Sequence, residues 1–496
     1  MGSTMHWLML FLAIAVASCG APNPEFCCVT EDQCAAAGVT GELRPCDVGQ
    51  ACNSASECVA QECVTSAECT SLDRPSCENG LCVAGCAIDD DCLGISGASR
   101  CDATTGECVG CVSNDQCPAE AEICDTETRS CRGCTGDEDC GGGICVEATG
   151  VCVDAEDAVY VTDGGVDTGD CPKPNPCASI QFALGRVTNT RNVIKILSAS
   201  LNPSNTSINL QRPVRIDATG NTRLTLRGNP GIAVSSVGTL IEGVSLRYEG
   251  TGDFLSIEDG AEFTLFAAVS EESALTTSRI NGELVVVRSE FQKGNSLACE
   301  LGKLAIRESR IIDSVVDTSG CTVNISRSHF VRGVGSAFGP EILRLSGGLA
   351  AIENNLIVQT EAGANSLSMS GHVSGSVFRF NTLVHTTTTP DNTTGIACSG
   401  IELTSNVLAL NSSLPISPNG GCSARNTLFD LTAGTQPGEN NQTADAATFF
   451  LDRSAGDYHL APDSPAKTLG EPGMVELDFD GNPRPSDPDS GAFEAP

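Results

Sequence analysis

Cysteine is the residue type with the widest chemical scope in this chain, because a thiol can form a disulfide, bind a metal or act as a nucleophile. The chain has 496 residues and 29 cysteines, of which 22 lie between Cys27 and Cys152. If Cys19 is set aside, the remaining 28 form an even number, which is typical of an exported protein with fully paired cysteines. The composition therefore predicts an oxidising compartment and a disulfide framework.

The cysteines of the N-terminal third recur in groups of four. Each group begins with the spacing C-x5-C, and few large apolar residues accompany it, so disulfides must hold these modules together. Four cysteines allow three pairings, and the sequence leaves the choice open. The regular groups are Cys63–Cys82, Cys86–Cys108, Cys111–Cys131 and Cys134–Cys152, and Cys28, Cys34, Cys46 and Cys52 form an imperfect earlier group that leaves Cys27 and Cys58 over.

The first loop of these groups is acidic. Hard oxygen ligands suit calcium, so calcium binding stays open, although Asp and Asn also favour turns and keep a core-poor module soluble. Zinc is disfavoured because the cysteines are too many and too regular and the region has no histidine, so no metal site or other cofactor is predicted. The acidic loops are Thr30–Gln33, Ile88–Asp91, Ser113–Gln116 and Gly136–Asp139.

No catalytic constellation is evident after residue 158. Sugar hydrolysis needs two carboxylates that face the substrate, and a lyase needs a basic proton acceptor beside clustered acids, whereas the acidic residues here are scattered. A G-x-S-x-G motif is absent, His329, His385 and His459 are interpreted as structural, and His372 lies in a Ser/Gly-rich turn. The only tryptophan is Trp7, so aromatic platforms for sugars are scarce. We predict no catalytic residue.

The charge of the chain restricts its partners. The formal net charge is −35, and no basic cluster is present that could neutralise phosphates. Binding to nucleic acid is therefore excluded, because that binding depends on the release of counterions by basic side chains. Anionic polysaccharides are disfavoured as well, unless calcium bridges them to the protein.

From about Asp157 the composition changes to Val, Ile, Leu, Ser, Thr, Asn and Gly. A motif recurs in which an apolar alternation is followed by Ser or Asn and a second apolar pair, as in Leu304–Ile311, and the polar positions are about 19 to 27 residues apart. A repeat of this length with short strands predicts a solenoid, and the period of two turns one side of each strand inward. We predict an all-β fold, a right-handed parallel β-helix solenoid preceded by a disulfide-rich repeat region.

Two sets of residues are expected to join successive coils. Asparagine at one fixed turn can stack coil on coil and tolerates the left-handed conformation of a sharp bend. The candidates for this turn ladder are Asn355, Asn381, Asn406 and Asn426. Cys299 and Cys321 are 22 residues apart, and Cys398 and Cys422 are 24 apart, so each pair would join neighbouring coils. Sandwiches and propellers would show hairpin signals or a longer blade repeat, and neither is seen.

The N-terminal segment is an apolar run that ends at an isolated cysteine. Trp7–Ala17 is too short to span a bilayer, and Val16-Ala17-Ser18-Cys19 resembles the lipobox of bacterial lipoproteins. In that family the leader is cut before the cysteine, which becomes the lipid-modified N-terminus. The resemblance implies a signal peptide over 1–18, lipidation of Cys19, a tether over 19–26, and a location at the outer membrane or cell surface.

Two further resemblances cover the rest of the chain. The cysteine groups resemble four-cysteine repeats of surface proteins from myxobacteria. Ala158–Gly165 with Asn175–Leu184, and Tyr458–Ala466 with Asp478–Glu494, resemble the opening and closing segments of pectin-lyase-like β-helix proteins, where a strand, a turn and a short helix cap the first coil. Cys171 and Cys177 would pin the loop before that helix. The implied domains are disulfide repeats over 27–153 and a β-helix over 154–496.

Three functions remain open at this stage. The favoured one is a lipid-anchored envelope protein that displays its β-helix for adhesion or for binding a glycan or a cell-surface protein, without catalysis. The pectin-lyase-like resemblance implies, as an alternative, a polysaccharide lyase or glycoside hydrolase whose residues come from separate coils. A purely structural role is the third. The expected partners are a membrane, through the lipid, and a polysaccharide or surface protein, but no nucleic acid.

Overall fold

The computed structural model describes residues 46–47, 50–52, 57–78, 80–201, 207–271, 276–292, 294–333, 341–360, 366–386, 395–417, 421–433 and 438–496. The chain divides into two compact units. One ends at Gly141 and includes Thr149–Cys152, and the other comprises Gly142–Ala148 and Val153–Pro496. The expected signal peptide, the lipidated Cys19 and the tether lie outside the described residues. No helix among the described residues has the length and apolarity needed to cross a membrane.

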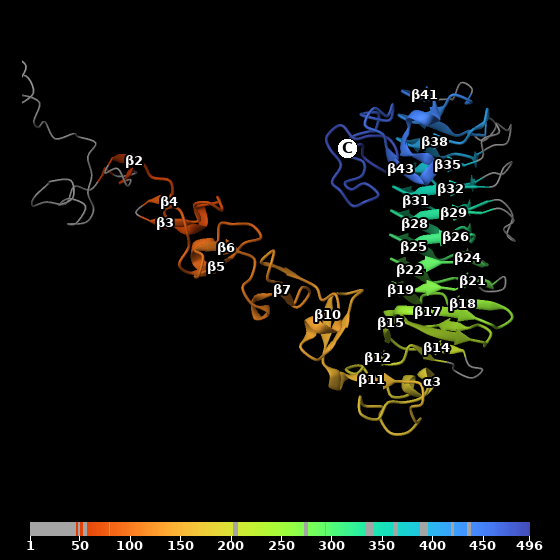
Figure 1. Ribbon diagram of the computed structural model, residues 1–496, viewed down its shortest axis with the longest axis horizontal. Helices are drawn as coiled ribbons and strands as arrows, with labels where there is room; N and C mark the ends of the chain where they lie inside the picture. Colours follow the sequence, from red (N-terminus) through yellow and green to blue (C-terminus); the bar gives the residue numbers. More distant parts are fainter. Residues whose placement is uncertain are drawn as a thin grey trace, which may run out of the picture. The chain divides into compact units, whose positions relative to one another are not determined.

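The regular cysteine groups in the first unit share one small fold, which Figure 1 shows in orange. A short 3-10 helix carries the first loop, and a two-stranded antiparallel hairpin follows, with the third and fourth cysteines opposite each other. The helices are η1 (Ser66–Glu68), η2 (Asp89–Cys92), η3 (Asn114–Gln116) and η4 (Asp137–Cys140). The hairpins are β3 (Ser76–Glu78) with β4 (Leu81–Val83), β5 (Arg100–Asp102) with β6 (Glu107–Val109), and β7 (Ile123–Asp125) with β8 (Ser130–Arg132).

The structure selects one of the three pairings that the sequence left open. The first cysteine of a group bonds to the third, and the second bonds to the fourth. The pairs are Cys63–Cys77 and Cys69–Cys82, then Cys86–Cys101 and Cys92–Cys108, then Cys111–Cys124 and Cys117–Cys131. In the last group Cys140 bonds to Cys152, its second to its fourth cysteine. Each hairpin is therefore held to its own loop by two bridges, which replace a hydrophobic core.

The assignment of the earliest cysteine group is wrong at one point. Cys58, which the spacing left over, is bonded to Cys46. The reason is that β1 (Gln50–Cys52) and β2 (Cys58–Ala60) form an antiparallel pair, which brings Cys58 close to this part of the chain. Cys27, Cys28 and Cys34 lie outside the described residues.

The second unit is a parallel β-solenoid of about nine turns, as predicted. Three strand positions recur in each full coil. Two of them belong to a 22-stranded sheet and the third to a 9-stranded sheet, counted over the described residues. The stacked strands are visible in Figure 1, from β11 to β41.

The larger sheet carries the first two positions. Its strands are β11 (Ala158–Val161), β12 (Val193–Ile196), β13 (Ser200–Leu201), β15 (Arg215–Leu226), β17 (Thr239–Tyr248), β19 (Glu262–Phe266), β20 (Val269–Ser270), β22 (Glu283–Val287), β23 (Glu290–Phe291), β25 (Lys303–Arg307), β26 (Arg310–Ile312), β28 (Thr322–Ser326), β29 (His329–Arg332), β31 (Ala350–Glu353), β32 (Leu356–Gln359), β34 (Val377–Arg379), β35 (Thr382–His385), β37 (Glu402–Thr404), β38 (Val407–Ala409), β39 (Ser423–Arg425), β40 (Leu428–Asp430) and β41 (Gln442–Ala444). The smaller sheet consists of β14 (Ile208–Leu210), β16 (Ile232–Val234), β18 (Asp253–Ile257), β21 (Thr276–Ile280), β24 (Asn295–Cys299), β27 (Val315–Ser319), β30 (Leu343–Ser346), β33 (Leu367–Ser370) and β36 (Ile396–Cys398).

The core lies inside the coils, where apolar side chains of consecutive strands stack in register. One column runs through Ile216, Ile241, Leu265, Val286, Ile306, Ile325, Ile352, Phe378, Leu403 and Ala424, all of them buried. Side chains on either side of such a position point outward, because successive residues of a strand face opposite sides. The period-2 pattern of the sequence thus becomes a continuous apolar interior.

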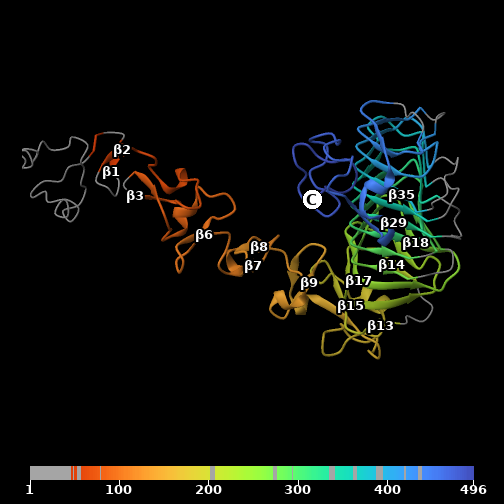
Figure 2. The same cartoon turned by 45° about the horizontal axis from the view of Figure 1, so that its top comes forward.

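Both ends of the solenoid carry additional structure. Helix α3 (Ile180–Leu184) begins at Ser179, whose Oγ accepts the backbone N–H of Phe182 at 3.2 Å, and its apolar side packs into the first coils. At the other end the closing segment, residues 445–496, contains η6 (Ala446–Thr448), β42 (Phe450–Asp452), η7 (Arg453–Ala455) and β43 (Asp457–Leu460). It lies beside the last coils, drawn in blue in Figure 2.

The closing segment covers an outer face that would otherwise expose apolar side chains. Phe449, Phe450 and Leu460 pack against outward-facing residues of β32, β35, β38 and β40. Covering such a face removes apolar area from water, which stabilises by roughly 25 cal/mol per Å². The outer face of the earlier strands in the same column, β13 to β29, is mostly polar instead.

Candidate functional site

A polar groove of the solenoid lies on this earlier outer face. It encloses about 800 Å³ and crosses the strands β13, β15, β17, β20 and β23. Ser200, Arg223, Ser245 and Val269 occupy one register position on consecutive coils, so neighbouring side chains are about 4.8 Å apart along the solenoid. The full lining is Ala199, Ser200, Arg223, Ser245, Arg247, Val269, Glu271 and Gln292.

Donors and acceptors in and beside the groove are paired with one another. Glu271 Oε1 lies 2.7 Å from Arg223 Nε and 2.5 Å from Ser245 Oγ. Arg247 Nε lies 3.1 Å from a carboxylate oxygen of Glu249. Both arginine side chains are about half exposed, at 55% and 47%, so each keeps donors available to a ligand. The groove therefore offers hydrogen-bonding groups of both kinds in nearly balanced charge.

The central carboxyl group of the groove is held ionised. Burial raises the pKa of Glu271, but hydrogen bonds from Ser245 and Arg223 outweigh it, so the pKa lies below its ordinary value. A general acid in glycoside hydrolysis needs the opposite shift, because it must carry a proton near neutral pH. Glu271 is suited to accepting hydrogen bonds from hydroxyl groups rather than to donating a proton.

Sequence reasoning did not single out Arg223, Arg247 or Glu271. They come from strands or strand ends 24 or more residues apart and meet only because the coils stack. The available signal was their place in the two-residue alternation of the strands, since Arg223 and Arg247 occupy outward positions in strands whose inward positions are apolar.

Of the histidines discussed above, His329 lies farther along this face. Burial, together with nearby Arg310, lowers the pKa of His329 to about 4, so it is neutral at pH 7.

The predicted turn ladder is present, in a more extended form. The backbone N–H of each ladder residue donates to the side chain of the ladder residue on the next coil. This series runs from Ala268 through Ser289, Ser309, Ser328, Asn355, Asn381, Asn406 and Thr427 to Asn441, with distances of 2.9–3.3 Å. Three of the four predicted asparagines, Asn355, Asn381 and Asn406, are therefore ladder residues.

The expectation for Asn426 is corrected by one position. Thr427 occupies the ladder, and Asn426 is the residue before it, with a φ of 51°. The same left-handed backbone occurs immediately before the other ladder residues, as at Asn354 and Phe380. The sequence pattern assigned the left-handed bend and the hydrogen bond between coils to one residue. In the structure one residue adopts the left-handed conformation and its successor makes the hydrogen bonds.

The six solenoid cysteines form three disulfides. Cys299 bonds to Cys321 and Cys398 to Cys422, and each pair joins neighbouring coils. Cys171 bonds to Cys177 in the loop before α3. In the repeats, the sulfur atoms that gather in groups of three likewise belong to disulfides.

The acidic loops of the repeats accept backbone hydrogen bonds. The residue before the second cysteine accepts the N–H that follows the first cysteine, at 2.7–2.8 Å, as Glu68 does from Val64, Asp91 from Ala87, Gln116 from Val112 and Asp139 from Thr135. A second loop position accepts the N–H of the third cysteine, as Ser66 does from Cys77, Asp89 from Cys101 and Asn114 from Cys124. Because neutral Gln116, Ser66 and Asn114 do the same work as the carboxylates, these positions need an acceptor rather than a charge. This geometry favours a turn role over calcium binding.

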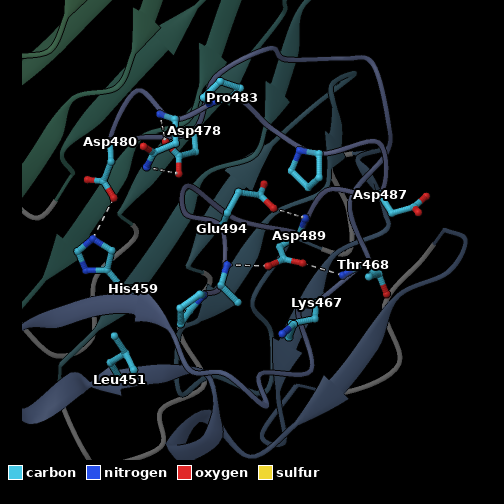
Figure 3. Close-up of a pocket in the computed structure, with 14 residues that line it drawn as sticks. Leu451, His459, Lys467, Thr468, Asp478, Asp480, Pro483, Asp487, Asp489 and Glu494 are labelled. Atoms are coloured by element: carbon cyan, nitrogen blue, oxygen red, sulfur yellow. Dashed lines mark hydrogen bonds and ion pairs between the residues drawn. The ribbon is translucent and has the colours of Figure 1, made fainter.

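A second cavity lies within the closing segment and is lined by acidic side chains (Figure 3). It encloses about 570 Å³. Asp489 accepts the backbone N–H groups of Thr468 and Ala495 at 2.8 and 2.7 Å, and Glu494 accepts that of Asp489 at 3.0 Å. These carboxylates hold the loops of the segment together, which accounts for their gathering without a ligand.

His459 is placed between two carboxylates of this segment. Its Nδ1 lies 2.6 Å from Oδ1 of Asp457, and its Nε2 lies 3.0 Å from Oδ2 of Asp480. Figure 3 shows the Asp480 side chain pointing toward the His459 ring. Burial lowers the pKa of His459, but hydrogen bonds to Asp457 and Asp480 prevail, and the pKa is raised. A raised pKa stabilises the folded form fully below the unfolded pKa, about 6.5, and this contribution is lost as the pH rises through the folded value.

We therefore expect the loop around Asp480 to loosen as the pH rises from about 6 to 8, across the range in which histidine titrates. An NMR titration of the His459 ring should give a pKa above that of a free histidine. In Asp480→Asn, where one carboxylate becomes a neutral amide, the pKa should move back toward the ordinary value. A wild-type ring that titrates at or below the ordinary value would contradict this assignment.

No protein-family model matches the chain, and no curated protein is significantly similar to it in sequence, so the function is argued from the geometry of its own residues.

Proposed function

We propose that this protein is displayed on the bacterial cell envelope and binds a glycan along the polar groove of its β-helix without cleaving it. The observation that carries the proposal is the groove itself, which crosses successive coils and holds hydrogen-bond donors and acceptors, among them Arg223, Ser245 and Glu271. The coils are about 4.8 Å apart, which is close to the length of one sugar unit, so successive units of a chain could meet side chains of successive coils.

The charge of the groove indicates which glycans it suits. Arg223 is paired with Glu271, and Arg247 shares Glu249 with Arg227, so the groove carries only a small excess of positive charge while the whole chain is strongly acidic. Neutral, hydroxyl-rich polysaccharides therefore fit better than polyanions, which the protein as a whole would repel. A cell-surface protein is the other ligand class that such a surface could bind.

The groove is tested by replacing Arg223 with Ala in the full-length protein. Loss of hydrogen bonds from a charged donor typically costs 1.5–3 kcal/mol, so we expect affinity for a neutral polysaccharide to fall roughly 10- to 100-fold. The measurement is binding to a panel of immobilised neutral and acidic polysaccharides. Arg307→Ala, an exposed arginine on β25 outside the groove, is the matched control and should bind like the wild type.

The same panel distinguishes binding from catalysis. Release of reducing ends or unsaturated products by the wild-type protein would contradict a non-catalytic role and revive the lyase or hydrolase alternative. If neither the wild-type protein nor Arg223→Ala binds any polysaccharide, the glycan proposal is wrong, and a protein ligand or a structural role takes its place.

Display on the envelope rests on the leader and on the cysteine chemistry. The lipobox-like segment before Cys19 supports a lipid anchor, and the disulfide-bonded repeats suit an oxidising exterior. We expect Cys19→Ser to lose the acyl chains and to leave the membrane fraction, because acyl chains supply the membrane affinity in such proteins. Mass spectrometry and fractionation of cells test this, and a variant that still carries lipid would rule out Cys19 as the anchor.

A further inference from the structure

A lysine and two carboxyl groups are buried side by side on the first coils of the solenoid. Lys195 on β12, Asp217 on β15 and Glu242 on β17 occupy one register position on consecutive strands. Their exposed fractions are 4%, 5% and 3%. The Nζ atom of Lys195 lies 2.5 Å from Oδ2 of Asp217. The amine nitrogen of Lys195 and a carboxylate oxygen of Asp217 are thus held in contact, with a second carboxyl group on the next strand.

These side chains face outward, yet they are sealed from water. Ile194 and Ile196, on either side of Lys195, point into the core, so Lys195 points away from it. The segment Gly142–Ala148, which belongs to the same compact unit, lies over the cluster. Its residues Ile144 and Val146 pack with apolar side chains of the outer face, and the N–H of Ala148 donates to Glu242 Oε2 at 3.0 Å.

The apolar cover formed by Gly142–Ala148 changes the protonation of Glu242. Burial raises the pKa of Glu242 to about 8, assisted by Asp217 and Glu147 and opposed by the Ala148 N–H and by Lys195. Glu242 Oε1 finds no hydrogen-bond partner among the described residues. Within the contact between Lys195 and Asp217, transfer of one proton from the ammonium to the carboxylate gives a neutral amine beside a neutral carboxylic acid. A neutral lysine amine is a nucleophile.

We propose that Lys195 and Asp217 become joined by a side-chain amide bond, with Glu242 as the proton carrier. The amine nitrogen attacks Cγ of Asp217, and Glu242 in its acid form donates a proton to the departing oxygen. Glu242 then takes up a proton from the nitrogen and returns to its starting state. One N–C bond forms, one C–O bond breaks, and one water molecule leaves, so the step needs no oxidant, reductant or activating group.

The proposed bond would close the solenoid where it begins. It joins β12 to β15, the strands that follow the cap helix α3, and the disulfide Cys171–Cys177 lies in the loop before that helix. In a repeat protein each coil contacts mainly its neighbours, so unfolding can start from an end. A covalent link between the first coils would keep this end from opening even when disulfides are reduced.

The test is the mass of the purified full-length protein after complete reduction and alkylation. We expect the wild-type chain to be lighter by one water molecule than the mass calculated for its processed and alkylated sequence, and Lys195→Arg and Asp217→Ala to match their calculated masses. Trypsin should release a branched peptide in which Asn192–Arg215 is attached through Lys195 to Ile216–Arg223. A wild-type protein with its full mass and a free Asn192–Lys195 peptide would overturn the proposal and leave a buried ion pair.

One variant and one internal control test the proposed mechanism further. Glu242→Gln keeps both reacting groups, so a loss of the cross-link in a folded variant supports proton transfer by Glu242, whereas an unchanged cross-link would overturn that role. Lys303 and Glu283 form an ion pair at 3.1 Å in the same register relation, but Lys303 is exposed and Glu283 is partly exposed. This pair is the internal control and should yield only unlinked peptides. A cross-link there would show that sealing from water is not what drives the reaction.

Discussion

Replacing Asn381 with Ala is expected to lower the free energy of unfolding of the solenoid by about 3–5 kcal/mol. The Asn381 side chain is fully buried and donates to the backbone oxygens of Ile352 and Arg379 at 2.8 and 3.1 Å. It also accepts the backbone N–H of Asn355 at 3.0 Å. Alanine would leave these groups inside the protein without partners, and each such group costs about 1–3 kcal/mol.

The measurement is equilibrium denaturation of the full chain, followed by the β-sheet circular dichroism signal. Asn324→Ala is the matched control, because Asn324 lies exposed on β28, and its loss should change stability by less than about 0.5 kcal/mol. Asn381→Ser should lose less stability than Asn381→Ala, since serine fills the same ladder at Ser309 and Ser328. Equal stabilities for Asn381→Ala and Asn324→Ala would show that the ladder carries no net stabilisation.

Arg484→Ala is expected to detach the end of the closing segment from the solenoid. The Arg484 side chain is 2% exposed and forms an ion pair with Glu494. Its Nη2 donates to Asn354 Oδ1 at 2.6 Å and to the backbone oxygen of Gly491 at 2.8 Å, and its guanidinium lies 4.3 Å from the ring centre of Phe380. Removing one partner of a buried ion pair costs about 3–5 kcal/mol, because the other charge is left uncompensated.

Hydrogen exchange reports this detachment at two amides. The N–H of Gly491 donates to the backbone oxygen of Ser405, and that of Ala492 donates to Thr382 Oγ1. Both should exchange faster in Arg484→Ala, by a factor of roughly 100 or more at this cost. Lysine keeps the charge but lacks the planar guanidinium group, so the exchange rates in Arg484→Lys should fall between those of the wild type and Arg484→Ala. If both amides remain as protected as in the exposed control Arg307→Ala, Arg484 does not hold the segment.

The sequence by itself determined the repeat architecture. Alternating segments such as Leu304–Ile311 indicate β-strands, and the distance between the recurring Ser and Asn positions indicates the length of one coil. The solenoid could therefore be inferred without a structure. The 22- and 24-residue separations of the solenoid cysteines followed from the same period. Such features are local or strictly periodic, and a single chain displays them directly.

Only the tertiary structure decided which side chains meet. The register between coils depends on the length and path of each turn, which explains why Thr427 rather than Asn426 joins the ladder. The same register assembles the groove at Arg223 and Glu271, and the buried cluster at Lys195 and Asp217, from different strands. The pairing of cysteines within a repeat likewise required the hairpin and its loop to be placed in space. Spacing along the chain limits these contacts, but the stacking of strands selects among them.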